Sequence, residues 1–308
     1  MKRREFIKKS VGAGVVAGTT LSVLNNEKLF AINKYQPDEL PYDLVAIKGG
    51  SPEAMFDKAI ASLGGISKFV KKNQTVVVKP NIGWDSTPER AANTNPGLVG
   101  RIIEHCINAG AKDVYVFDHT CNEWTRCYRN SGIEAAVKKA GGKMVPGNSS
   151  ANYHPVEVKR GKVLKNTKVH ELILESDVFI NVPTLKNHGG TRLSICMKNL
   201  MGIVWNRSWW HANDLQQCIA DFSTYRKPDL NVVDAYRVLK RNGPRGVSVN
   251  DVVTMKYQVL STDMVASDAA SAKIFGLQPN QVRHITLAGQ LGSGIVDLNK
   301  LRINRITI

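Results

Sequence analysis

Residues 75–81 read TVVVKPN, an apolar β-branched run that ends abruptly in polar residues. Valine favours the extended conformation, so the run predicts a β-strand. A strand that is apolar on both faces is typical of a parallel sheet covered by helices on both sides. Helical spacing over 97–109 and a second apolar strand over 113–117 complete the strand–helix–strand unit that such a sheet needs.

The same alternation continues along the chain. Further strands are expected at 44–47, 143–145, 177–182 and 231–234, and further helices at 52–63, 133–140, 214–225 and 265–276. Ser51 and Pro52 suit the start of the first helix, as a cap and a first-turn residue. Residues 153–170 alternate around Arg160-Gly161-Lys162, which predicts a small hairpin insertion. The sequence therefore predicts a single α/β domain over 43–308, with a mostly parallel sheet and helices on both faces.

The N-terminus has the pattern of a twin-arginine export signal. Residues 3–9 read RREFIKK, and a weakly apolar run of 14 residues follows at 11–24. That run is too short to cross a hydrocarbon core of about 30 Å. We predict a signal at 1–31 and a connector at 32–42, with the twin-arginine export machinery as a partner and a periplasmic or otherwise exported location.

The charge balance favours anionic partners. The formal net charge is +16, of which residues 1–31 contribute +4. The basic residues are dispersed, and zinc-finger spacing, an RNA-binding aromatic signature and a dense basic run are all missing, which argues against nucleic acid. No later segment approaches transmembrane length, so no stable membrane span is predicted.

The five cysteines do not form a C-x-x-C motif. Cys106 lies in a helical apolar pattern and is expected in the core. Cys121 and Cys127 are six residues apart, so a local disulfide is conceivable in an oxidising compartment. Together with Asp118 and His119 they could also bind a metal, although the spacing matches no standard zinc pattern. The metal and the cofactor therefore stay undetermined.

Polar residues recur where the predicted strands end. Lys79 to Asn81 follow one strand, Asp118 follows the next, residues 183–188 follow a third, and Asp234 ends a fourth. Ligands of open α/β sheets bind beyond the carboxyl ends of the strands, so one site is expected there.

Several segments, in this order, resemble one family. They are VKPN at 78–81, NVPTLKNH at 181–188, MKNLMG at 197–202, His211, LNVVDA at 230–235, GPRG at 243–246 and STDMVASD at 261–268. The order and spacing resemble the domain-of-unknown-function family 362 over about residues 47–297. The resemblance implies no particular reaction. Some members of that family carry ferredoxin-like iron–sulfur modules, but this chain lacks the C-x-x-C-x-x-C run that such a module needs.

Three lysines carry the candidate chemistry: Lys79, Lys186 and Lys198. An amine among apolar residues must find an anion or lose its proton. They could bind a carboxylate or phosphate, or supply an amine for acid–base or Schiff-base chemistry. Alternatively, they could form structural ion pairs with the late aspartates Asp234, Asp263 and Asp268.

The predicted site combines these lysines with neighbouring polar residues. The predicted catalytic residues are Lys198, His188, His211 and Asp234, with the histidines as proton-transfer groups or metal ligands. The predicted ligand-binding residues are Lys79, Asn81, Lys186, Asn199, Asp263 and Asp268.

Two further segments have open interpretations. Gly189-Gly190-Thr191 could bind an anion through backbone N–H groups if a helix begins near Thr191, or could be a simple turn. Trp205, Trp209 and Trp210 could form a lid or stacking wall for a ligand, or a hydrophobic plug under a loop.

The leading functional interpretation is an exported enzyme that acts on a small anionic ligand through a Lys/His/Asp site. A non-catalytic binding protein for an anionic metabolite is one alternative, and a metal- or iron–sulfur-associated redox protein is another. The sequence names neither the substrate nor the reaction.

Overall fold

The valine strand belongs to the parallel part of a mixed ten-stranded sheet. A computed structural model describes residues 39–308, of which 40–308 form one compact unit. The predicted signal at 1–31 lies outside the described residues. Strand β2 (Thr75–Pro80) pairs in parallel with β3 (Asp113–Val116) and with β7 (Val178–Val182). The parallel part continues through β4 (Lys143–Met144) on one side and β10 (Leu230–Leu239) on the other.

The sheet continues beyond β10 with an antiparallel strand. This part of the sheet was not fully predicted. Strand β11 (Val252–Ser261) runs antiparallel between β10 and β1 (Leu44–Lys48), and β12 (Ile303–Thr307) forms the edge, parallel to β1. Our sequence analysis did not predict β11 or β12, because the first part of β11 and all of β12 are partly or fully exposed and neither strand forms a continuous apolar run. Most strand pairs are nevertheless parallel, which confirms the predicted sheet type.

Residues beyond β7 form strands where a loop was expected. Strand β8 (Thr184–His188) pairs in parallel with β10, and β9 (Arg192–Ser194) returns antiparallel to β8. The chain therefore extends past the carboxyl end of β7 as a hairpin. The small insertion predicted at 153–170 is confirmed as a separate two-stranded sheet of β5 (Tyr153–Glu157) and β6 (Asn166–His170).

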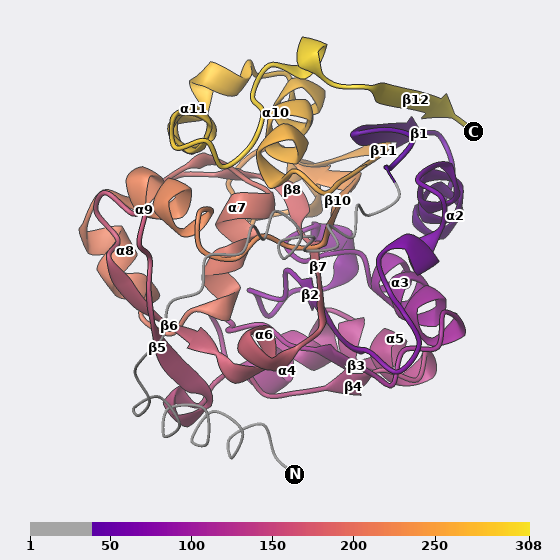
Figure 1. Ribbon diagram of the computed structural model, residues 1–308, viewed down its shortest axis with the longest axis horizontal. Helices are drawn as coiled ribbons and strands as arrows, with labels where there is room; N and C mark the ends of the chain where they lie inside the picture. The colour runs from indigo at the N-terminus through magenta and orange to yellow at the C-terminus, as the bar shows by residue number, and fades with distance from the viewer. Residues whose placement is uncertain (1–38) are drawn as a thin grey trace, which may run out of the picture. The chain divides into compact units, whose positions relative to one another are not determined.

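Helices cover both faces of the sheet, as predicted (Figure 1). One face is covered by α2 (Pro52–Ser62), α3 (Pro96–Asn108) and α5 (Ile133–Lys139). The other is covered by α7 (Cys196–Asn199), α9 (Leu215–Phe222), α10 (Met264–Phe275) and α11 (Arg283–Gln290). Alternate residues of β2 face opposite layers: Val76 and Val78 join the first core, and Val77 joins the second.

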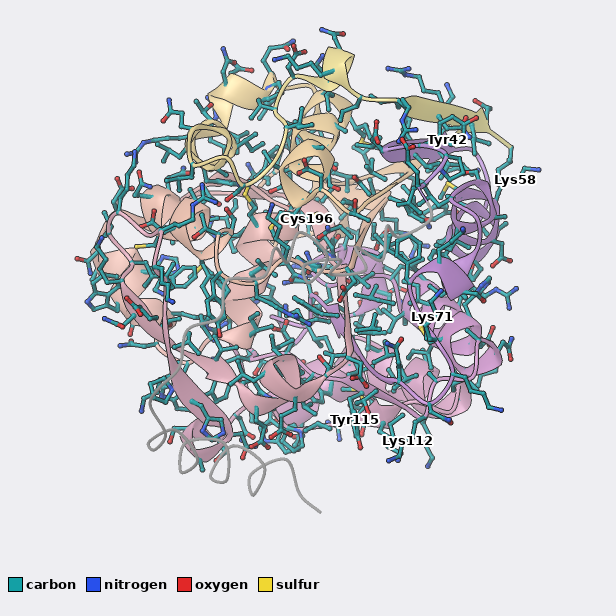
Figure 2. All side chains as sticks on the ribbon, in the orientation of Figure 1. Tyr42, Lys58, Lys71, Lys112, Tyr115 and Cys196 are labelled. Atoms are coloured by element: carbon teal, nitrogen blue, oxygen red, sulfur yellow. The ribbon has the colours of Figure 1, made fainter. Side chains whose placement is uncertain are left out.

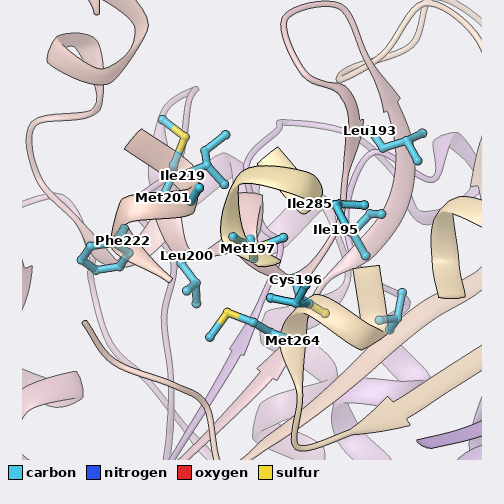
Figure 3. Close-up of a cluster of buried hydrophobic side chains, with 14 of the residues drawn as sticks. Leu193, Ile195, Cys196, Met197, Leu200, Met201, Ile219, Phe222, Met264 and Ile285 are labelled. Atoms are coloured by element: carbon cyan, nitrogen blue, oxygen red, sulfur yellow. The ribbon is translucent and has the colours of Figure 1, made fainter. Parts of the chain in front are cut away.

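The second core fixes α7, the short helix that carries Lys198. Figure 3 shows Met197 and Leu200 gathered with Ile219 of α9, Met264 of α10 and Ile285 of α11. These side chains are fully or almost fully buried. Close packing on this scale leaves little freedom for the backbone of α7.

Local capping signals set the helix ends close to their predicted positions. The Ser51 side chain accepts a hydrogen bond from the N–H of Ala54, and Pro52 is the first helical residue. Helix α3 stops before Gly110, whose φ of +88° suits glycine.

The cysteines and the basic surface complete the description. All five cysteines lie within 39–308 and are free thiols, with Cys106 buried as expected and Cys121 exposed. Lys58, Lys71 and Lys112 point outward from separate parts of the surface (Figure 2). Within the described range, none of the helices has both the length and the apolar character needed to span a bilayer.

Candidate functional site

A cavity of about 60 Å³ opens beyond the carboxyl ends of β2 and β3, beside β8 and α7. Since one water molecule needs about 10–15 Å³ of such space, the cavity suits a few waters or a small ion. Its lining consists of Lys79, Asn81, Gly83, Trp84, Asp118, His119, Cys121, Lys186, His188, Ser194, Lys198, Asn199, Met201, Gly202, Arg207 and Pro244. The cavity thus lies where the strand-end rule places ligands.

Lys79 forms the buried ion pair of the cavity. Its Nζ lies 2.9 Å from Asp118 Oδ1 and donates to Asn199 Oδ1 at 2.9 Å. Asp118 Oδ2 accepts a hydrogen bond from the N–H of Ile82 at 2.6 Å. Burial lowers the pKa of Lys79, and the neighbouring Asp118 opposes that effect. The partner of this lysine is therefore Asp118 and none of the three late aspartates.

Gly202 explains why the segment 197–202 ends in glycine. A Cβ atom at this position would overlap both Asp118 Oδ1 and Lys79 Nζ. The backbone of residue 202 therefore lies directly against the ion pair, where only glycine fits.

Lys186 has neutral partners only. Its Nζ donates to Asn81 Oδ1 at 2.7 Å and to the carbonyl oxygen of Ala92. Its side chain is almost fully buried, and that burial lowers its pKa to about 7. This amine is fixed in position and can lose its proton near neutral pH.

Lys198 is the amine with the fewest partners. Its Nζ contacts Met201 Sδ at 3.1 Å and has no carboxylate within ion-pair distance among residues 39–308. A thioether is a weak acceptor. Burial lowers the pKa of Lys198 to about 8, and the charges of Arg207 and Lys79 add to the effect.

A chain of asparagines holds α7 against the sheet. Asn199 Nδ2 donates to Asn181 Oδ1 at 2.8 Å, and Asn181 Nδ2 donates to Asn231 Oδ1 at 3.0 Å. Asn81 Nδ2 also donates to Asn199 Oδ1. Our sequence analysis missed Asn181 and Asn231, although both interrupt apolar strands, which was the available signal.

The structure places the three late aspartates away from the cavity lining. Asp234 accepts from the N–H groups of Asn95 and Tyr236. Asp263 accepts from the first N–H groups of α10, and Asp268 accepts from those of Cys196 and Met197. Burial raises the pKa of Asp234 to about 6 and that of Asp268 to about 7. The alternative expectation, that they pair with the lysines, is contradicted by these contacts.

The two predicted histidines have different positions. His188 lines the cavity, and its Nδ1 lies 3.0 Å from the N–H of Gly190. Burial and the charges of Lys198 and Lys186 lower the pKa of His188 to about 3. His211 is exposed on α8 (Arg207–Ala212) and lies outside the lining, yet burial and then Lys198 lower its pKa.

The segment 189–191 is the turn between β8 and β9, so the simple turn is the correct interpretation. No helix begins at Thr191.

Arg207 holds the loop after β3 in place through hydrogen bonds. Our sequence analysis did not predict this residue as part of the site. It donates to the carbonyl oxygens of His119 and Thr120, each at 2.7 Å, and lies 3.6 Å from Cys121 Sγ. Nothing in the sequence near residue 207 pointed to this role.

The three tryptophans have different surroundings. Trp205 stacks on His119 with ring centroids 4.8 Å apart, next to the cavity. Trp210 is buried and packs against Phe222, while Trp209 is 39% exposed. Trp210 therefore fits the hydrophobic plug, whereas Trp205 stacks on a protein side chain and does not line the cavity.

The candidate metal ligands after β3 each contact a different protein group. Asp118 pairs with Lys79, His119 Nδ1 lies 2.9 Å from the carbonyl oxygen of Val204, and Cys127 Sγ donates to Gly83. In the part of the chain that the structure describes, no three His, Cys, Asp or Glu side chains are grouped to hold a metal ion.

Comparisons with known proteins address the family and the fold. The chain is 24% identical over 261 residues to the thylakoid-associated protein sll1697 of Synechocystis sp., which covers 80% of this chain and 76% of that protein. The lactate racemase apoprotein from Thermoanaerobacterium thermosaccharolyticum aligns with a TM-score of 0.43 at 13% identity, over 69% of this chain and 53% of that one. A Thermotoga maritima protein aligns with a TM-score of 0.45 at 11% identity, over 78% and 60% of the two chains.

A family model extends over more than half of the chain. The family described as Domain of unknown function (DUF362) matches residues 76–273, which include every residue of the cavity lining. The chain therefore belongs to the DUF362 family.

Proposed function

We propose that the protein is an enzyme that binds a small anionic substrate in this cavity, with the Lys198 amine as the group that contacts the substrate. The observation that carries the proposal is the amine of Lys198, which has no oxygen partner among residues 39–308, in a strongly cationic lining. Four cationic side chains line the cavity, and Asp118 is the single carboxylate among the lining residues.

The other three cations are already satisfied by the protein. Lys79 is held by Asp118, Lys186 by neutral oxygens, and Arg207 by two backbone carbonyls. Lys198 contacts only a sulfur atom. Because a partly buried charge without an oxygen partner is costly, a ligand oxyanion is the natural partner for this amine.

Ser194 supports the same conclusion independently. It lines the cavity and is only 6% exposed, and its hydroxyl has no hydrogen-bond partner within residues 39–308. The oxygen of this hydroxyl is accessible rather than sealed inside the protein, so it is available to hydrogen-bond a ligand in the cavity.

The size and the acidity of the amine favour catalysis on a small molecule. A cavity of about 60 Å³ suits a carboxylate or phosphate compound of a few heavy atoms. An amine whose pKa is lowered to about 8 can exchange a proton near neutral pH, which suits acid–base chemistry.

Calorimetric titration with acetate, oxalate and inorganic phosphate tests the proposal. We expect the wild type to bind at least one probe, and Lys198→Met to weaken that binding by roughly 10- to 100-fold, because a charge-assisted hydrogen bond is lost. The control is Lys112→Met, which removes one exposed positive charge outside the cavity. Equal binding by the wild type and Lys198→Met, or no binding of any probe by the wild type, would overturn the proposal.

We also propose that the protein acts outside the cytoplasm, after export by the twin-arginine route. The support is the paired arginines before a weakly apolar run at 11–24. Replacing both Arg3 and Arg4 by lysine should retain the mature protein in the cytoplasm on fractionation. A Lys8→Arg, Lys9→Arg variant keeps the pair and should be exported normally. Export of the first variant at the wild-type level would contradict this location.

A further inference from the structure

Two histidines of the cavity lining carry their ring protons on opposite nitrogens. His188 Nδ1 lies 3.0 Å from the backbone N–H of Gly190, a group that can only donate. Nδ1 of His188 is therefore the acceptor. In the neutral ring the proton is then on Nε2, which leaves His188 with one N–H to offer a ligand.

His119 has the reverse arrangement. Its Nδ1 lies 2.9 Å from the carbonyl oxygen of Val204, a group that can only accept. Nδ1 of His119 therefore carries the proton, and Nε2 keeps an unused lone pair. Trp205 stacks on the ring, and Arg207 holds the backbone carbonyl of the same residue, so both the ring and its loop are fixed.

Both rings are kept neutral by their surroundings. Burial lowers the pKa of His119, and the charge of Arg207 adds to the effect. Burial and the charge of Lys198 lower that of His188. The cavity thus combines a neutral base, a neutral hydrogen-bond donor and the ammonium of Lys198, which lies close enough to His188 to influence its ring.

We propose that His119 is the catalytic base of this site and His188 its neutral hydrogen-bond donor, and that the substrate is a small oxo acid. The inference rests on the proposed function, because Lys198 would hold the carboxylate. The carbonyl oxygen would then accept from His188 Nε2–H, and the carbon next to the carbonyl would present its hydrogen to His119 Nε2.

The proton transfer balances without any further reactant. The C–H bond breaks and an N–H bond forms at His119 Nε2, while the C–H electron pair becomes the C=C bond of an enolate. The negative charge moves to the former carbonyl oxygen, where His188 and Lys198 stabilise it electrostatically. Return of a proton from the imidazolium, after exchange with solvent, regenerates the oxo acid.

Hydrogen exchange in D₂O measures this step directly. The full chain is incubated with pyruvate, 2-oxobutyrate or acetoacetate, and loss of the proton signal at the carbon beside the carbonyl is followed by NMR. We expect the wild type to accelerate exchange in at least one probe. His119→Gln should slow the accelerated exchange by roughly 100-fold or more, the usual effect of losing a general base, while probe binding changes less than about threefold.

Two controls separate the roles. His154→Gln changes an exposed histidine of β5 and should leave exchange unchanged. Lys198→Met should weaken probe binding by roughly 10- to 100-fold, as above. Failure of the wild type to bind any probe would contradict the proposed function, whereas binding of every probe without exchange would overturn the oxo-acid inference.

The tautomers give a test that needs no substrate. Long-range ¹H–¹⁵N correlation spectra of the wild type, assigned with His119→Gln and His188→Gln, distinguish the protonated from the unprotonated ring nitrogen. We expect a proton on Nδ1 of His119 and on Nε2 of His188. A proton on Nε2 of His119, or exchange at the wild-type rate in His119→Gln, would overturn the assignment of this residue as the base.

Discussion

The late aspartates and the lysines of the cavity are stabilised in different ways. Asp234, Asp263 and Asp268 each accept hydrogen bonds from two or more backbone N–H groups. Lys198 has no oxygen partner in the part of the chain that the structure describes. Helix N-termini provide free N–H groups in abundance, so a carboxylate can be satisfied locally by the backbone.

A lysine needs acceptors, and most backbone carbonyls are already used in helices and strands. The difference teaches how to distinguish a structural charge from a functional one in this protein. Charges that hold the fold have their full set of partners, whereas the charge that we assign to the ligand lacks one. Lys79 is the informative exception, because it lies in the cavity but pairs with Asp118. The comparison therefore predicts that replacing Lys79 or Asp118 destabilises the fold, as replacing one of the aspartates does. Replacing Lys198 should not destabilise it.

The largest effect is expected for Asp118→Asn. Removing one partner of a buried ion pair leaves Lys79 uncompensated and should reduce the free energy of unfolding by about 3–5 kcal/mol. Urea denaturation measures the loss. The matched control is Asp113→Asn, which breaks the more exposed pair with Lys143 and should cost less than about 1 kcal/mol. Similar losses of unfolding free energy in the two variants would show that the buried ion pair stabilises the fold no more than the exposed one.

Asp268→Ala should have the next largest effect. It leaves the N–H groups of Cys196 and Met197 without their acceptor, at about 1–3 kcal/mol for each group. Asp268→Asn retains one acceptor oxygen and should lose less stability in the same urea experiment. If alanine and asparagine are equally tolerated, the carboxylate does not hold α7 in place.

Lys198→Met should leave the stability of the ligand-free protein unchanged or increased. The change removes a poorly partnered charge and adds apolar surface, so we expect no loss beyond about 0.5 kcal/mol at pH 7. Lys79→Met is the comparison. It leaves the buried carboxylate of Asp118 without its ion-pair partner and should be strongly destabilising. A large loss of melting temperature in Lys198→Met would show that this lysine serves the fold.

The pH dependence of the unfolding free energy should give the most gradual effect. Lys198 has a pKa of about 8 when folded, against an ordinary value of 10.5. Between these values the unfolded chain binds more protons, so this lysine makes the unfolding free energy rise with pH, by at most about 1.4 kcal/mol per pH unit.

Urea curves for the wild type and Lys198→Met, recorded from pH 7 to 10.5, measure that contribution. The wild type should gain on the variant mainly above pH 8. Asp268 should act in the opposite direction, because its raised pKa makes stability fall between about pH 4 and pH 7. Parallel curves for the wild type and Lys198→Met would mean that the lysine titrates at its ordinary pKa.

Much of the fold followed from local sequence patterns. The apolar run at 75–78 and its helical neighbours predicted the parallel sheet, and Ser51 with Pro52 predicted the start of α2. Strands β11 and β12 could not be predicted in the same way, because their partly exposed residues lack a continuous apolar signal. Of the residues predicted to share one site, those that line the cavity are Lys79, Asn81, Lys186, His188, Lys198 and Asn199, at the edge where the carboxyl ends of parallel strands meet. Those that lie outside the lining are His211, Asp234, Asp263 and Asp268.

The residues that reach the edge of the sheet could be named from local patterns, since strand periodicity and strand ends are local properties. Only the tertiary structure decided which charge meets which partner. Lys79 lies in β2 and Asp118 follows β3, and Asp268 reaches the N-terminus of α7 from another helix. A carboxylate in a sequence looks the same whether it will meet an amine or a backbone N–H. The ring protons of His119 and His188 depend likewise on single contacts made by folding, because the energy of a buried polar group is set by its nearest partner in space.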